Sequence, residues 1–154
     1  MIDSLRQLLS GGLCGPADGG RGAVEVALAA LLVEAANSDH HFDDRERATI
    51  ARLLERRFGL SHERAGELLA AGEREADREV EIFHLTRTIN ERWSREERIE
   101  LIEMLWEVAY ADGVLDKYED SLLRRVGGLV YVPDRERGLA RRRVLRRLGI
   151  DPEA

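Results

Sequence analysis

The sequence predicts an all-α fold, a compact bundle of about seven or eight helices built on two similar helix–acidic bend–helix hairpins. Apolar residues recur at helical spacing through most of the 154 residues. No stretch alternates apolar and polar residues as a half-buried strand does, and the valine-rich piece 129–132 is too short to found a sheet. A third observation is an internal repeat, because residues 105–119 resemble residues 32–46.

Each copy of the repeat consists of an apolar helix, an acidic bend of the form D-x-x-x-D-x-x-E and the start of a second helix. A unit of this kind cannot bury its apolar face alone, so we expect the copies, at 24–58 and 97–130, to pack against each other. The positions shared by the two copies are Leu32/Leu105, Glu34/Glu107, Ala36/Ala109, Asp39/Asp112, Asp43/Asp116, Glu46/Glu119 and Ile50/Leu123.

The N-terminal residues 1–22 are expected to precede the helical domain, which spans 23–150. Residues 2–9 have the apolar spacing of a short amphipathic helix. Residues 11–22 hold six glycines and a proline, a composition that favours a linker because fixing a glycine backbone is entropically expensive.

The sequence predicts three helices in the first half of the domain. Helical spacing of apolar residues indicates the first over 24–37. The second begins at 43 or 44 and ends at 58, where Gly59 suits a C-terminal cap. A short helix then follows over 61–72, with Gly72 expected to close it.

The middle of the chain predicts an apolar helical face and then the longest helix. Ser94-Arg-Glu-Glu97 matches a capping box, in which the serine oxygen and the glutamate carboxylate each satisfy a backbone amide at the helix start. The helix that begins there extends to Tyr110. The apolar face before it comprises Val80, Phe83, Ile89 and Trp93.

The last two helices follow the second acidic bend. One ends at Leu129, and Pro133 opens an arginine-rich helix that ends near Gly149. That helix can dock through an apolar stripe while its cations balance the acidic remainder. Alternatively, the cations form a basic surface for an acidic protein partner or for peripheral contact with anionic lipid head groups. The stripe is Leu139, Val144, Leu145, Leu148 and Ile150, and the cations are Arg135, Arg137, Arg141, Arg142, Arg143, Arg146 and Arg147.

The composition excludes several classes of function. The formal net charge of −6 argues against nucleic acid as a partner, because binding to phosphates depends on clustered cations. Cys14 is the only cysteine, so neither an intrachain disulfide nor a cysteine zinc site can form. We find no secretion signal and no apolar run long enough for a transmembrane segment, so we expect a cytoplasmic protein.

The sequence contains none of the common catalytic motifs. The G-x-S-x-G elbow, the Walker loop, the dinucleotide fingerprint and H-E-x-x-H are all absent. We therefore expect a protein that is not an enzyme.

The acidic bends admit two interpretations. Asp43 and Asp116 suit helix caps, and an acid three residues later is favoured by the helix dipole. Asp39 and Asp112, in contrast, follow a helix end, where the dipole disfavours a negative charge. Crowded carboxylates repel one another unless a cation or a neighbouring arginine lies between them. Calcium or magnesium prefers such oxygen ligands, and His40 beside Asp39 leaves zinc as an alternative.

The paired bends resemble the TerB-like family, which is named for tellurite-resistance proteins and is related to the N-terminal segment of a DnaJ-like co-chaperone. Residues 109–119 fit the family pattern A-x-A/S-D-G-x-x-D-x-x-E closely. Residues 36–46 depart from it, because His40 replaces the glycine. The resemblance covers roughly residues 23–145 and is greatest to the stand-alone bacterial branch.

The resemblance implies a helical, non-enzymatic module with a divalent metal ion, calcium first, bound between the bends, and a stress response of the tellurite type. The alternative is a metal-free interaction module or co-chaperone-like adaptor, in which the same acids are caps and a docking surface for a basic protein. Carried over by position, the metal ligands are Asp39, Glu46, Asp112 and Glu119, with Asp43 and Asp116 beside them chiefly as caps.

Overall fold

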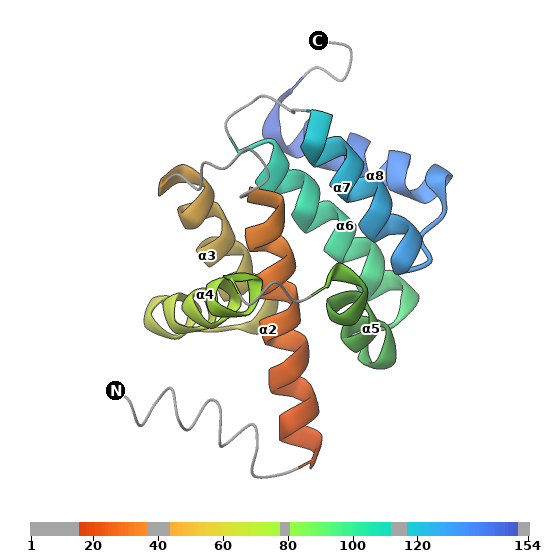
Figure 1. Ribbon diagram of the computed structural model, residues 1–154. Coiled ribbons are helices and arrows are strands. Elements are labelled where there is room, and N and C mark those ends of the chain that lie inside the picture. Colours follow the sequence, from red (N-terminus) through yellow and green to blue (C-terminus); the bar gives the residue numbers. More distant parts are fainter. Residues whose placement is uncertain (1–15, 37–43, 78–80, 112–116, 151–154) are drawn as a thin grey trace.

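The computed structural model describes residues 16–36, 44–77, 81–111 and 117–150, with the backbone alone for 16–21 and 117–120. Within these ranges the chain forms seven α-helices and no strand, which confirms the predicted all-α bundle (Figure 1). The expected helix at 2–9 lies outside them. The helices are α2 Pro16–Ala36, α3 Asp44–Phe58, α4 His62–Asp77, α5 Ile82–Arg92, α6 Arg95–Ala109, α7 Lys117–Leu129 and α8 Asp134–Leu148.

Helix α2 lies at the centre of the molecule and packs against α3, α4, α5, α6 and α7 (Figure 1). Its sequence is apolar on nearly all sides, as expected of a helix that other helices surround. The apolar residues that the two sequence copies share are all buried. They are Leu32, Ala36 and Ile50 from the first copy and Leu105, Ala109 and Leu123 from the second.

Two helix bounds differ from the sequence-based expectation. Helix α2 begins at Pro16, so residues 16–22 of the expected linker are helical. Proline is favoured in the first turn of a helix because its fixed φ suits the helix and its missing N–H has no partner there anyway. Helix α4 continues through Gly72 to Asp77. Gly72 is buried against α2, where an added Cβ would lie 2.6 Å from the Cβ of Ala29, so close packing explains this glycine.

Three helices end in the same way, with one residue in the left-handed region. Gly59 after α3 (φ 63°) and Gly149 after α8 (φ 71°) are glycines, as the sequence predicted. After α7 this place is taken by Tyr131, with φ 60°. In each case the next amide donates to a carbonyl in the last helical turn, and the three bonds are Leu60 N to Glu55 O, Val132 N to Gly127 O and Ile150 N to Leu145 O.

The capping box at the start of α6 is present as predicted: the Ser94 hydroxyl accepts from the Glu97 amide, and the Glu97 carboxylate accepts from the Ser94 amide. The apolar face expected before it is only partly correct. Ile89 and Trp93 are buried, but Phe83 is 57% exposed, and Val80 lies outside the described residues. Helix α5 instead buries Leu85, which lies four residues before Ile89 and therefore on the same face.

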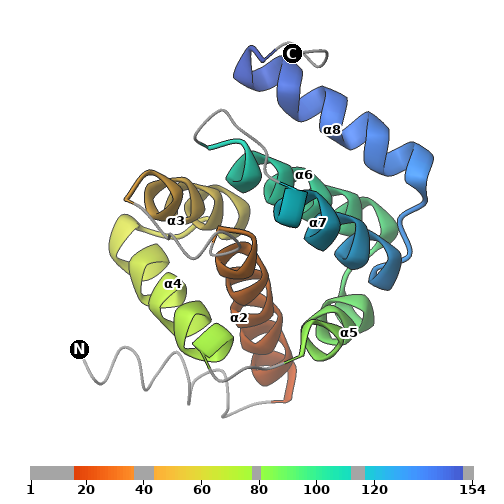
Figure 2. The ribbon, with the colours of Figure 1, turned by 45° about the horizontal axis from the view of Figure 1, so that its top comes forward.

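Helix α8 lies on the outer side of α6, away from α2 (Figure 2). It buries Ala140, Val144 and Leu145, whereas Leu139 and Leu148, expected in the same stripe, are about two-fifths exposed. None of the described helices is both long and apolar enough to cross a membrane.

Candidate functional site

The helix ends that flank the two acidic bends lie toward the same end of the molecule. Helices α2 and α6 end there, and α3 and α7 begin there, at the top of Figure 1. Glu46 lies in the first turn of α3 and Glu119 in the first turn of α7. The other four predicted ligands, Asp39, Asp43, Asp112 and Asp116, lie outside the described residues, as does His40.

Glu46 is the predicted ligand whose side chain the structure describes, and it is only 6% exposed. An ionised carboxylate is rarely buried without partners, because removing it from water is costly. At this position the positive end of the α3 dipole stabilises it. Sequence reasoning identified Glu46 by its place in the repeat and gave no signal of its burial.

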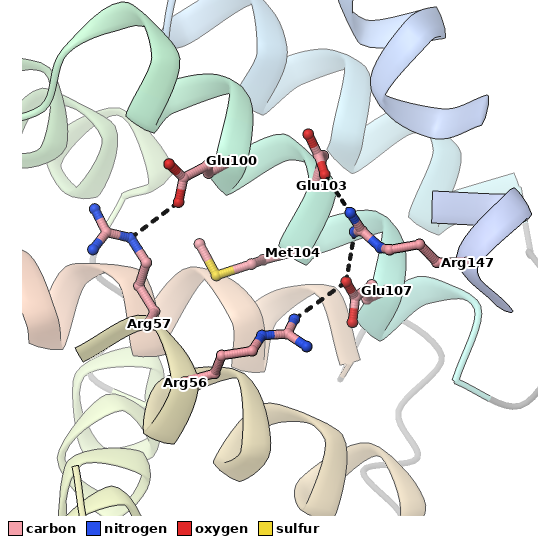
Figure 3. Close-up of a pocket in the computed structure, with 7 residues that line it drawn as sticks. All are labelled: Arg56, Arg57, Glu100, Glu103, Met104, Glu107 and Arg147. Atoms are coloured by element: carbon pink, nitrogen blue, oxygen red, sulfur yellow. Dashed lines mark hydrogen bonds and ion pairs between the residues drawn. The ribbon is translucent and has the colours of Figure 1, made fainter. Parts of the chain in front are cut away.

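The part of the chain that the structure describes holds no group of three or more His, Cys, Asp or Glu side chains able to bind a metal ion. Three acids of α6 instead face arginines of α3 and α8. A pocket of about 410 Å³ lies between α3, α6 and α8 (Figure 3). It is lined by Arg56 and Arg57 of α3, Glu100, Glu103, Met104 and Glu107 of α6, and Arg147 of α8.

Glu107 is the most buried of the acids that line this charged pocket. It is 6% exposed, and its Oε1 accepts from Nη2 of Arg147 at 2.7 Å and lies 3.5 Å from Nη2 of Arg56 (Figure 3). Arg147 also donates from Nη1 to Glu103 at 2.8 Å. Arg147 and Arg56 thus neutralise the charge of Glu107 within the protein itself.

The charges around Arg147 affect its protonation. Partial burial lowers the pKa of Arg147, but the hydrogen bond to Glu103 and the negative charges of Glu107 and Glu103 outweigh it. The pKa therefore lies above the usual value. Arg147 is therefore a cation at neutral pH.

Glu34, the counterpart of Glu107 in the first copy, has a different environment. It is half-buried in α2, and burial raises its pKa, with a further contribution from the charge of Asp77 at the end of α4. The same acid therefore has different neighbours in the two copies: Glu107 faces arginines, whereas Glu34 faces the carboxylate of Asp77. The sequence repeat gave no signal of this difference.

Arg57 forms a second polar cluster that sequence reasoning missed. Its Nη2 donates to Glu97 at 2.6 Å, and its guanidinium lies 4.7 Å from the ring centre of Trp93. The hydrogen bond from the Ser94 amide is the main reason that the pKa of Glu97 is lowered; partial burial opposes it, and Arg57 adds to it. The partners lie far apart in sequence, so no local pattern could have revealed the cluster.

Comparisons with known proteins agree with the helical architecture. The family model described as "Tellurite resistance protein TerB" matches residues 25–142. The crystal structure of a protein of unknown function from Porphyromonas gingivalis W83 superposes with a TM-score of 0.57 at 20% identity, covering 78% of this chain and 88% of that one. At this identity the likeness shows the fold alone. No curated protein matches the chain.

Proposed function

The chain belongs to the tellurite resistance protein TerB family. From this premise we propose that it is a non-enzymatic module that binds a divalent cation through its two acidic bends, with calcium as the first candidate. The ligands are Asp39, Glu46, Asp112 and Glu119, assisted by Asp43 and Asp116. We place the module in the cytoplasm, in a stress response of the kind that the family name suggests.

The observation that carries this proposal is the position of Glu46. Its buried carboxylate lies at the end of the molecule where α2 and α6 end and α3 and α7 begin. Both bends connect helices at that end. The donor set fits calcium or magnesium, because all six side chains offer carboxylate oxygens, which such hard cations prefer. The bound ion would balance charges that otherwise repel one another.

The test is a calorimetric titration of chelator-treated protein with calcium, magnesium and zinc, followed in parallel by the melting temperature. A cation that binds only the folded chain raises its stability, by about 2.7 kcal/mol at one hundred times Kd. Glu46→Gln and Asp112→Asn should each weaken binding. Glu63→Gln is the matched control, since Glu63 also lies in the first turn of a helix but is exposed, and its helix follows the opposite end of α3 from Glu46.

A second candidate function is a metal-free interaction module whose acids contact a basic protein or act as an adaptor. It is favoured by the first-turn positions of Glu46 and Glu119, where a carboxylate stabilises a helix without any ion. If none of the three ions gives binding heat or a melting shift, that result would support this candidate and overturn the first. Turnover of a substrate that stops on chelation would overturn both.

A further inference from the structure

The arginines of α8 divide into an inward and an outward group. The inward ones are engaged within the protein. Arg141 donates to the Tyr110 hydroxyl, at 2.9 Å from Nη2, and lies over the Trp106 ring. Arg137 pairs with Asp134. Arg143 and Arg147 pair with acids of α6.

The outward group consists of Arg135, Arg142 and Arg146. All three are exposed, and no described residue forms an ion pair with them. Together with Leu139, which is 41% exposed, they are spaced by four, three and four residues. This spacing places them on one face of the helix, in a line about 16 Å long. We call these four residues the basic stripe.

Nothing on α8 itself balances the basic stripe. The acids of this helix are both in its first turn, where Asp134 pairs with Arg137 and Glu136 with Arg95. From residue 137 to 148 the helix contains arginines and no acid. The stripe is therefore a local positive surface on a chain whose formal net charge is −6.

We propose that the basic stripe is a docking surface for an acidic segment of a partner protein. Its three guanidinium groups match carboxylates on the partner, since a guanidinium donates two parallel hydrogen bonds to a carboxylate. Leu139, between Arg135 and Arg142, offers an apolar contact for an aliphatic residue between those acids. The best-fitting segment is a helix with acids at the spacing of the three arginines and a leucine between the first two.

Two observations favour a protein segment over an anionic membrane. The apolar face of α8, with Ala140, Val144 and Leu145, is buried and cannot enter a lipid interface. A flat anionic membrane also faces a wide area of a molecule whose formal net charge is −6, whereas a short acidic segment can lie along the stripe alone. Screening limits both interactions to about one Debye length, roughly 8 Å. The stripe therefore suits a partner that is narrow and acidic.

The probe is a labelled alanine-based helical peptide with glutamates at i, i+7 and i+11 and a leucine at i+4, and binding to the full chain is followed by fluorescence anisotropy. The same peptide with glutamines is its control. The protein is kept in chelator, so this test is independent of the cation site. We expect the glutamate peptide to bind about tenfold more tightly than the glutamine peptide, and the difference to shrink as salt is raised to about 0.3 M.

Two triple variants separate the stripe from general charge effects. Arg135→Gln/Arg142→Gln/Arg146→Gln should remove the glutamate preference and leave the melting temperature unchanged, because these side chains are exposed. The matched control changes Arg52, Arg64 and Arg74 of α3 and α4 to glutamine, which removes the same charge from exposed arginines elsewhere, and should leave the peptide affinity within about twofold.

Three results would overturn the proposal. One is equal binding of the two peptides, and another is equal loss of affinity in the two triple variants. The third is stripe-dependent binding to phosphatidylserine vesicles that exceeds binding to the peptide, which would assign the stripe to a membrane.

Discussion

Nη2 of Arg147 lies 2.7 Å from Oε1 of Glu107, so an ion pair joins the last helix of the chain to a carboxylate that is 6% exposed. Arg147 itself is about half exposed, at 49%. If Arg147 is removed, the charge of Glu107 stays largely shielded from water, whereas if Glu107 is removed, water can still solvate the charge of Arg147. This asymmetry decides which partner is more costly to remove.

Replacing Arg147 with methionine should destabilise the protein by about 1–2 kcal/mol, because among the described residues the buried carboxylate of Glu107 then keeps Arg56 alone, at 3.5 Å, as a cationic partner. The measurement is urea unfolding. Arg146→Met is the control, since Arg146 is exposed and should change stability by less than about 0.5 kcal/mol. Equal effects of the two variants would show that the ion pair contributes no specific stability.

Two glycines of α4 should respond to alanine in opposite directions. At Gly72 an added Cβ would meet the backbone of Ala29 and Ala30 at 2.8–2.9 Å, so Gly72→Ala should destabilise the protein by about 1–3 kcal/mol. At Gly66 nothing lies within 4 Å, and alanine should stabilise the helix by about 0.5–1 kcal/mol. Thermal unfolding of both variants tests this, and a gain at Gly72 would contradict the close approach of α2 and α4.

Tyr131→Gly should stabilise the protein by about 1 kcal/mol. Tyr131 is 73% exposed, so little buried surface is lost, and glycine adopts φ 60° without the strain that a side chain brings. The reverse change at an equivalent helix end, Gly149→Ala, should destabilise by a similar amount. Denaturant unfolding of both variants is the measurement. A loss of stability in Tyr131→Gly would mean that the tyrosine ring makes contacts that outweigh the strain.

The half-buried Glu34 should make stability depend on pH. Its pKa in the folded chain lies above the unfolded value of 4.5. The stability that the neutral carboxyl contributes is therefore fully present below pH 4.5 and is lost as the pH rises through the folded pKa. At pH 7 the charge opposes folding, and Glu34→Gln should raise the melting temperature. The gain should disappear near pH 4.

Asp77→Asn provides the control for that prediction. The charge of Asp77 is the second cause of the raised pKa of Glu34, after burial. In the Asp77→Asn background the gain from Glu34→Gln should therefore be smaller at pH 7. A gain that is the same at both pH values and in both backgrounds would contradict an electrostatic origin.

The sequence predicted those parts of the fold that local chemistry determines. Gly59 and Gly149 end helices because a left-handed residue is needed there, and the Ser94 capping box starts one because its two bonds form within four residues. The continuation of α4 through Gly72 was not predicted, because its cause is Ala29 on another helix. Turn and helix rules do not include such tertiary contacts.

For the candidate site, too, the sequence predicted the local features and missed those that depend on distant residues. The repeat identified Glu46, Glu107 and Glu119 as acids of interest. Their environments depend on residues far away in sequence, such as Arg147, which lies 40 residues from Glu107. Sequence reasoning offered an arginine as the alternative to a metal ion, and at Glu107 the structure provides arginines. For the bends themselves, the cation remains a prediction.

The position of α8 has a consequence for how the protein opens. This helix packs chiefly on α6, outside the group of helices around α2, and part of its attachment is ionic. A peripheral element with few buried apolar residues can detach while the remainder stays folded. Its amides should therefore exchange with solvent hydrogen before those of α2, and faster still in high salt, where the Arg–Glu pairs are screened. The last helix would then behave as a separate cooperative unit whose detachment is controlled by ionic strength.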